Sequence, residues 1–389
     1  MIISTTKESC PGERRVALVP ASVGPLIKAG FEVRIESGAG VSAGFPDARY
    51  AEKGAKIVSR DEALKADCLV QIRAAGANPA GAAGMRCLHS GQIVIALCDP
   101  LGMPGDARAM AEGGITLISL ELVPRITRAQ SMDVLSSQAT IAGYRAVLLA
   151  AAALPKMFPM MTTAAGTITP AKVFVVGAGV AGLQAIASAR RMGAVVSAYD
   201  VRAAVKEQVQ SLGAKFVEMP LDASAEGQGG YAKAMDEEFY RRQRELMTTV
   251  VAGSDVVITT AAVPGKKAPT LITAEMVAAM PPGGVIVDVA AERGGNCALT
   301  RPGETVVENG VTIIGPANLP ADVPYHASQM FAKNVTTLIE HLVADGQFRF
   351  DLEDEITRET LVTKDGQVVH AKVRELLGLP VEQAIGDRR

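Results

Sequence analysis

The stretch from residue 171 to residue 200 decides the fold and reads AKVFVVGAGVAGLQAIASARRMGAVVSAYD. The apolar, β-branched runs at 172–176 and 195–199 predict buried strands, and the pattern at 181–192 predicts the helix that connects them. Two strands joined through a helix are normally parallel neighbours in one sheet. The stretch therefore predicts a βαβ unit.

Three glycines lie where the first of these strands meets the helix. We expect Gly177 to make the tight turn, Gly179 to let a pyrophosphate approach the backbone, and Gly182 to let the helix pack closely on the strand. Asp200 ends the second strand, at the spacing expected for a carboxylate that bonds a ribose hydroxyl. It favours NAD over NADP because it would repel a 2′-phosphate, whereas Arg202 argues for the opposite preference. An ordinary β-turn-α with incidental glycines is the alternative.

The same alternation of strands and helices extends in both directions from this unit. Strands are expected at 31–36, 68–72, 93–97 and 116–119, and again at 215–217, 256–260, 285–290 and 312–315. Helices are expected at 22–29, 60–66, 106–112, 203–212, 237–252 and 273–280. Strands separated by helices indicate parallel sheets that are covered on both faces.

Two long helical patterns, at 137–154 and 328–343, join the halves of the chain. The segment after them, with a predicted hairpin at 360–370, is too short for a third domain and is expected to return to the first. We predict an α/β fold of two doubly wound, Rossmann-like domains joined by long helices. The first domain comprises residues 1–136 and 328–389, and the second comprises residues 137–327.

Composition excludes several classes of protein. The 389 residues are 48% hydrophobic and 21% charged with a net charge of −2, which predicts a packed core and no nucleic-acid partner. The longest apolar run, 146–155, has about half the length of a membrane-spanning helix. The first residues lack the order of a signal peptide. The five cysteines form no CxxC pair, so we expect a soluble protein of a reducing compartment, without disulfides or a metal site.

The segment 121–144, ELVPRITRAQSMDVLSSQATIAGY, lies at the junction of the two predicted domains, where clefts form. It is dense in donors and acceptors, namely Arg125, Arg128, Gln130, Asp133, Ser136 and Ser137. Gln130 and Asp133, with Arg125 and Ser136, have the donors and acceptors that fix the plane of a carboxamide. A capped helix start, with Ser131 or Asp133 as the N-cap, is the alternative.

This polar segment contains no histidine or cysteine that could transfer a proton. The four histidines of the chain, at 89, 326, 341 and 370, fall in no motif. Oxidation of an alcohol or amine requires a group that accepts a proton as hydride leaves. Transfer of hydride between two nicotinamides requires only aligned rings and exclusion of water. The sequence therefore favours transfer between two nicotinamides.

A glycine-rich segment leads into a charged helix at 226–247, which reads EGQGGYAKAMDEEFYRRQRELM. Flexible glycines before a tyrosine predict a mobile lid with Tyr231 at its tip. A plain surface loop is the alternative.

Four stretches together resemble one family. They are PGERRVALVP at 11–20, RAQSMDVLSSQ at 128–138, GAGVAGLQAIA at 177–187 and GGYAKAM at 229–235. They are similar to the NAD(H)-binding domain I, which is the first portion of a split alpha subunit, of proton-translocating nicotinamide nucleotide transhydrogenases, over residues 1 to 341. The alanine- and glycine-rich segment 77–87 departs from the family pattern.

The resemblance implies the residues of the site. The nicotinamide would be held by Arg125, Gln130, Asp133 and Ser136 as catalytic positions, with Ile126, Thr127 and Arg128 beside them. The pyrophosphate would meet Gly177, Gly179, Val180 and Gly182, and the adenosine would meet Asp200, Val201 and Arg202. Gly230, Tyr231 and Gln243 match the mobile loop, and Ala262 matches a position near the cofactor.

The resemblance also implies partners and a reaction. Domain I binds NADH as a homodimer, domain III of the beta subunit binds NADP(H), and the membrane domain II carries protons. Hydride would pass directly from NADH to NADP⁺, as in the Si-specific/Re-specific, proton-translocating NAD(P)⁺ transhydrogenases. The chain would be cytoplasmic and peripheral on the inner face of the cell membrane.

Two other functions compete with this interpretation. Alanine dehydrogenase shares the architecture and the ERRVALVP start, and its substrate arginine would match Arg15. Its catalytic lysine and histidine would fall at Arg73 and Leu97, where neither side chain can act as a titrating base. A non-catalytic NAD sensor is the third possibility, although cofactor binding alone would not require so polar a segment at 121–144.

Overall fold

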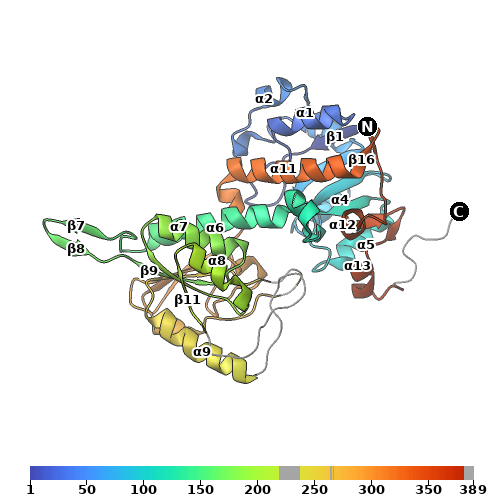
Figure 1. Cartoon of the computed structure of the whole chain (residues 1–389). Coiled ribbons are helices and arrows are strands. Elements are labelled where there is room, and N and C mark those ends of the chain that lie inside the picture. The colour runs from blue at the N-terminus through green and yellow to red at the C-terminus, as the bar shows by residue number, and fades with distance from the viewer. Residues whose placement is uncertain (219–236, 263–264, 266, 381–389) are drawn as a thin grey trace. The chain divides into compact units, whose positions relative to one another are not determined.

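The computed structural model describes residues 1–218, 237–262, 265 and 267–380 of the chain (Figure 1). They divide into two compact units. Unit 1 comprises Met1–Gln138 and the described part of Pro320–Arg389, and unit 2 comprises the described part of Ala139–Leu319. The division falls within helix α6 (Val134–Ala153). Among the described residues, no helix is long and apolar enough to cross a membrane.

Unit 1 is built on an eight-stranded sheet with the order β19-β18-β6-β5-β4-β1-β2-β3. The strands are β1 (Ile2–Thr5), β2 (Glu32–Glu36), β3 (Lys56–Val58), β4 (Cys68–Arg73), β5 (Ile93–Leu97), β6 (Thr116–Ser119), β18 (Leu361–Lys364) and β19 (Gln367–Val368). Strands β1 to β6 are parallel to one another. The order reverses between β1 and β4, so the loops that follow these two strands leave in opposite directions.

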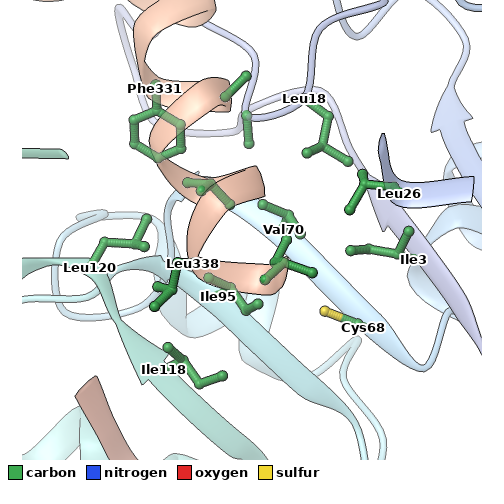
Figure 2. Close-up of a cluster of buried hydrophobic side chains, with 14 of the residues drawn as sticks. Ile3, Leu18, Leu26, Cys68, Val70, Ile95, Ile118, Leu120, Phe331 and Leu338 are labelled. Atoms are coloured by element: carbon green, nitrogen blue, oxygen red, sulfur yellow. The ribbon is translucent and has the colours of Figure 1, made fainter. Parts of the chain in front are cut away.

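Both faces of this sheet are buried, which explains its continuous apolar strands. Val70, Ile95 and Ile118 pack in the same core as Phe331 and Leu338 of α11 (Figure 2). The preceding residues Leu69, Val94 and Leu117 point to the other face and pack with Ala107 and Met110 of α5. The helices of unit 1 are α1 (Pro20–Lys28), α2 (Asp47–Ala51), α3 (Arg60–Leu64), α4 (Gly81–Met85), α5 (Pro104–Glu112), α11 (Pro324–Leu342), α12 (Glu355–Thr360) and α13 (Ala371–Leu376).

The C-terminal hairpin β18–β19 belongs to the sheet of unit 1. Strand β18 pairs antiparallel with β6, with Leu361 opposite Ile118. The buried Thr363 hydroxyl secures this pairing, because it donates to Ile115 O at 2.7 Å and accepts from Leu117 N at 3.0 Å. The end of the chain therefore completes a sheet that its first residues begin.

Unit 2 contains a seven-stranded sheet with the order β11-β10-β9-β12-β13-β15-β14, parallel except for β14. Its strands are β9 (Lys172–Val176), β10 (Val195–Tyr199), β11 (Lys215–Phe216), β12 (Val256–Thr259), β13 (Val285–Asp288), β14 (Thr305–Glu308) and β15 (Val311–Ile314). Its helices include α7 (Val180–Arg191), α8 (Lys206–Ser211), α9 (Glu237–Ala252) and α10 (Ala274–Ala278). The order reverses between β9 and β12, and in open α/β sheets ligands bind at such a reversal, beyond the carboxyl ends of the strands.

The expected elements are present with shifted ends, and several short ones were not expected. α6 begins at Val134 and α11 at Pro324, where 137 and 328 were expected. The additional elements include β1, β3, α2, α4 and β14 and the hairpin of β7 (Met161–Thr163) and β8 (Gly166–Ile168). All six residues of the two hairpin strands are exposed, and Figure 1 shows the hairpin projecting from the rest of unit 2. An exposed hairpin has no buried face and so produces no apolar alternation in the sequence.

Candidate functional site

The glycine turn lies at the carboxyl end of β9, beside the strand-order reversal of unit 2. Gly177 makes the turn with φ of +94°, a conformation that favours glycine. A Cβ built on Gly182 would lie 1.8 Å from Gly177 O, so only glycine lets α7 start this close to the strand. A Cβ on Gly179 would meet no atom within 4 Å, which leaves open space on that side of the turn. Val180, the first residue of α7, is exposed.

Asp200 follows β10 and is bonded to the glycine turn. Its carboxylate accepts from Ala178 N at 2.8 Å and from Arg202 through N, Nε and Nη2 at 2.9, 2.9 and 2.8 Å. Burial alone would raise the pKa of Asp200, but the hydrogen bonds from Arg202 and Ala178 outweigh it and hold this pKa below its usual range. Four donors fill the lone-pair sites of the carboxylate. A ribose hydroxyl that bonds to Asp200 therefore has to displace one of them. Val201 lies half-buried between the two charged residues.

The segment after β12 forms the other side of the turn. Thr260 Oγ1 donates to Gly177 O at 2.9 Å, and a Cβ on Gly177 would lie 2.7 Å from this hydroxyl oxygen. Ala261 is half-buried and Ala262 is exposed. Our sequence interpretation missed Thr260. The signal was available, since Thr260 follows the strand that neighbours β9, where polar residues of a parallel sheet gather.

Gln243 is buried on α9, and its Nε2 donates to the hydroxyl of Tyr199 at 3.1 Å. Burial raises the pKa of Tyr199 to about 12, so this hydroxyl stays protonated. Tyr199 immediately precedes Asp200, which links α9 to the adenosine side of the expected site. Gly230 and Tyr231, expected in the lid, lie outside the described residues.

The polar segment of unit 1 contains the short 3₁₀ helix η3 (Thr127–Met132), which leads to α6. Asp133 Oδ1 accepts from Ser136 N at 2.9 Å and Oδ2 from Ser136 Oγ at 2.5 Å. Asp133 therefore has the hydrogen bonds of an N-cap of α6, which is the alternative that the sequence left open. The exposed residues of this segment include Arg125, Thr127, Arg128, Gln130 and Ser131, while Ile126, Asp133 and Ser136 are half-buried.

The guanidinium of Arg128 is bound to a distant residue of unit 1. Arg128 Nη2 donates to Asp354 Oδ1 at 2.5 Å, 226 residues away in the sequence. Asp354 also caps α12 through Thr357 N at 2.8 Å and lies 2.9 Å from His341 Nε2. These partners hold the pKa of Asp354 well below its usual range, against the effect of burial. The sequence offered no signal for this ion pair.

A second cluster of charged side chains lies near the strand-order reversal of unit 1. The buried Arg15 pairs with Glu13, through Nε at 2.8 Å and Nη2 at 2.6 Å, and its Nη1 donates to Gln138 Oε1 at 2.8 Å. Arg73 Nε lies 3.7 Å from Glu13 Oε2. The arginine that would match a substrate arginine in alanine dehydrogenase is thus bound by a carboxylate and an amide of its own chain.

Glu8 belongs to this cluster and accepts from Ile72 N at 2.7 Å and Arg73 N at 3.3 Å. Burial raises the pKa of Glu8 to about 8. The nearby Glu13 also raises this pKa, whereas the hydrogen bonds from Ile72 N and Arg73 N lower it. A carboxyl that binds its proton more tightly when folded stabilises the protein at low pH. Raising the pH from 5 to 8.5 should therefore lower the free energy of unfolding, by about 4 kcal/mol from this group.

Urea unfolding at several pH values tests this prediction. The Glu8→Gln variant should lose most of the decline between pH 5 and 8.5, while a Glu112→Gln variant at an exposed position should parallel the unmodified chain. Parallel curves for all three proteins would show that Glu8 titrates as an ordinary carboxyl.

Comparison with known proteins places the chain in a family. Residues 4–142 match the family described as alanine dehydrogenase/PNT, N-terminal domain, and residues 146–371 match alanine dehydrogenase/PNT, C-terminal domain. The chain belongs to the alanine dehydrogenase/PNT family. The resemblance and the α/β fold class predicted from the sequence are thereby confirmed, since transhydrogenase and alanine dehydrogenase structures share this fold.

Within the alanine dehydrogenase/PNT family, the chain is more similar to transhydrogenases than to alanine dehydrogenases. It is 47% identical over 376 residues to the first portion of NAD(P) transhydrogenase subunit alpha from Rhodospirillum rubrum, which covers 95% of this chain and 98% of the relative. The solved structure of the transhydrogenase from Sinorhizobium meliloti matches with a TM-score of 0.83 and 44% identity, over 95% of this chain and 99% of that one. Alanine dehydrogenase from Bacillus subtilis (strain 168) is 28% identical over 399 residues, which cover 100% of this chain and 98% of the relative. These relatives support an NAD(P) transhydrogenase role, and the family supports NAD(H) binding.

Proposed function

We propose that the chain is the NAD(H)-binding subunit of a proton-translocating transhydrogenase. It binds NADH at the glycine turn of unit 2 and presents the reduced nicotinamide to NADP⁺ on a partner domain. The C4–H bond of the reduced ring breaks as the same bond forms on the oxidised ring, so hydride is conserved and no proton is released. The stereochemistry is that of the Si-specific/Re-specific class.

One observation of the structure carries this proposal. Asp200 Oδ2 accepts from Ala178 N at 2.8 Å, which fixes a carboxylate on the glycine turn at the strand-order reversal of unit 2. A carboxylate beside such a turn suits the ribose of NAD(H) and disfavours the 2′-phosphate of NADP(H). In the proposed site, Gly177, Gly179, Val180 and Gly182 contact the pyrophosphate. Asp200, Val201 and Arg202 contact the adenosine, and Gly230, Tyr231, Gln243 and Ala262 complete the pocket.

The polar segment of unit 1 is proposed to hold the nicotinamide. Arg125, Gln130, Asp133 and Ser136 supply donors and acceptors for its carboxamide, with Ile126, Thr127 and Arg128 beside them. The bond from Ser136 Oγ to Asp133 Oδ2 at 2.5 Å supports this role, because it fixes both side chains before the ligand arrives. These residues orient the ring, since hydride transfer between nicotinamides requires no titrating base.

The proposal includes partners and a place in the cell. NADP(H) is bound by domain III of a beta subunit, protons cross a membrane domain II, and this chain is a homodimer. The chain is cytoplasmic and held on the inner face of the cell membrane by those subunits. The match over 98% of a relative that is itself a portion of an alpha subunit supports a role as one piece of a larger assembly.

Reconstitution tests the proposal. The purified chain is mixed with NADH, NADP⁺ and the cognate domain III, and NADPH formation is followed, with alanine plus NAD⁺ as a parallel assay. We expect activity only when the partner is present. NADH formation from alanine without the partner would overturn the proposal in favour of a dehydrogenase. NADH binding without either activity would indicate a sensor.

A further inference from the structure

The carboxylate of Asp288 is the centre of a buried hydrogen-bond network at the carboxyl end of β13. Asp288 is fully buried, with 0% exposure. Its Oδ1 accepts from Thr259 Oγ1 at 3.0 Å and Ala290 N at 3.1 Å, and its Oδ2 accepts from Asn296 N at 2.7 Å, Cys297 N at 2.9 Å and Thr300 Oγ1 at 2.7 Å. Four of these five donors belong to the segment 289–300, which thus folds around one side chain.

Two consecutive glycines make this arrangement possible. Gly294 and Gly295 have φ of +95° and +78°, in the left-handed region that favours glycine. A Cβ on Gly295 would lie 2.7 Å from Asp288 Oδ2, so the backbone turns directly over the carboxylate. The residue that leaves this turn is Asn296, whose own N–H is one of the five donors.

Asn296 transmits the position of this segment to the glycine turn. It is fully buried, with Oδ1 accepting from Ala261 N at 3.0 Å and Nδ2 donating to Ala261 O and Pro269 O, both at 2.8 Å. Both polar groups of the Ala261 backbone are therefore held by one side chain. Ala261 follows Thr260, whose hydroxyl bonds to Gly177 O at 2.9 Å.

We propose that Asp288 and Asn296 are positioning residues of the dinucleotide site. Asp288 fixes the position of Asn296, and Asn296 fixes the backbone of residues 260–262. These residues in turn contact the glycine turn at Gly177. Neither side chain has to touch the ligand, because a buried network with all its members satisfied holds a single geometry. This inference rests on the proposed binding of NAD(H) at the glycine turn, but not on hydride transfer or on any partner.

Titration of NADH into Asp288→Asn and Asn296→Asp variants of the full chain tests the inference. In Asp288→Asn, an amide N–H₂ faces N–H and hydroxyl donors. In Asn296→Asp, a second oxygen faces the carbonyls of Ala261 and Pro269. Each change should displace residues 260–262, and we expect the Kd for NADH to rise about tenfold. Asn296→Ala, which removes the bonds without repulsion, should give a smaller rise and provides a second variant if the others fail to fold.

Asp255 offers a matched control in the same sheet. It is a buried aspartate at the amino end of β12, and it accepts from Lys172 N at 2.9 Å and Lys156 Nζ at 2.6 Å. Asp255→Asn should lower the midpoint of thermal unfolding, as Asp288→Asn should. Its Kd for NADH should nevertheless stay within about twofold of the value for the unmodified chain. Unchanged NADH affinity in folded Asp288→Asn and Asn296→Asp, or an equal loss in Asp255→Asn, would overturn the inference. Absence of NADH binding in the unmodified chain would instead overturn the proposed function.

Discussion

Replacing Gly182 by alanine is expected to weaken NADH binding by about 100-fold. The new Cβ would lie 1.8 Å from Gly177 O and 3.2 Å from Thr260 Oγ1, closer to the carbonyl than atoms can approach. The start of α7 or the glycine turn must therefore move, and in the proposed site the pyrophosphate would lose the N–H groups that the turn presents. Titration of NADH, followed by its fluorescence, measures the loss.

Two other glycines make this experiment specific. Gly179→Ala adds a Cβ with no atom within 4 Å, so the protein should fold normally and lose affinity only because the ligand approaches there. Gly105→Ala, on the exposed surface of α5, also meets no atom and should leave NADH binding unchanged. If Gly182→Ala binds NADH as well as Gly105→Ala does, the turn is not the dinucleotide site.

Replacing Asp133 by alanine is expected to reduce hydride transfer to NADP⁺ by about 100-fold while changing the Kd for NADH by less than about threefold. Asp133 holds Ser136 through two hydrogen bonds, at 2.9 and 2.5 Å. Without them, the groups proposed to orient the nicotinamide lose their fixed positions, whereas the proposed adenosine and pyrophosphate contacts of unit 2 remain. The rate is measured in the reconstituted system with saturating NADH.

A second helix cap in unit 1 provides a control that distinguishes a loss of nicotinamide orientation from a loss of protein stability. Ser59 caps α3 by accepting from Glu62 N at 3.3 Å, so Ser59→Ala should cost about 1 kcal/mol of stability, as loss of the Asp133 cap does. Ser59→Ala should leave the transfer rate unchanged. Equal slowing in Ser59→Ala and Asp133→Ala, or equal losses of binding and rate in Asp133→Ala, would mean that Asp133 does not orient the nicotinamide.

The central strands could be predicted from the sequence because they are buried on both faces. The runs at 93–97, 116–119, 172–176 and 195–199 coincide with β5, β6, β9 and β10. Strand β1 (Ile2–Thr5) was missed because its Ser4 and Thr5 are buried as polar residues. Their hydroxyls donate to Ala63 O at 2.6 Å and Val70 O at 2.8 Å, which are distant in the sequence. Such partners leave no local pattern.

In the candidate site, too, residues whose partners are distant in the sequence could not be predicted. The glycine turn and Asp200 could be predicted as a site because their spacing is local to one βαβ unit. Thr260, Asp288 and Asn296 were missed because they come from strands and loops that only the parallel sheet brings to one edge. The capping geometry of Asp133 could be considered from the sequence, but the long-range partner of Arg128 could not.

The return of the C-terminal hairpin to the first sheet has a consequence for synthesis on the ribosome. The strands of the seven-stranded sheet lie between Lys172 and Ile314. In unit 1, by contrast, β6 gains its second neighbouring strand only after Leu361–Lys364 has been synthesised, and its core partners on α11 only after Pro324–Leu342 has been synthesised. The middle of the nascent chain can therefore fold before its beginning does. Until Leu361–Lys364 emerges, β6 has an unpaired edge, which can template pairing with another chain and so promote aggregation. Slow translation before Leu361 should thus affect the N-terminal part of unit 1, Met1–Gln138, first.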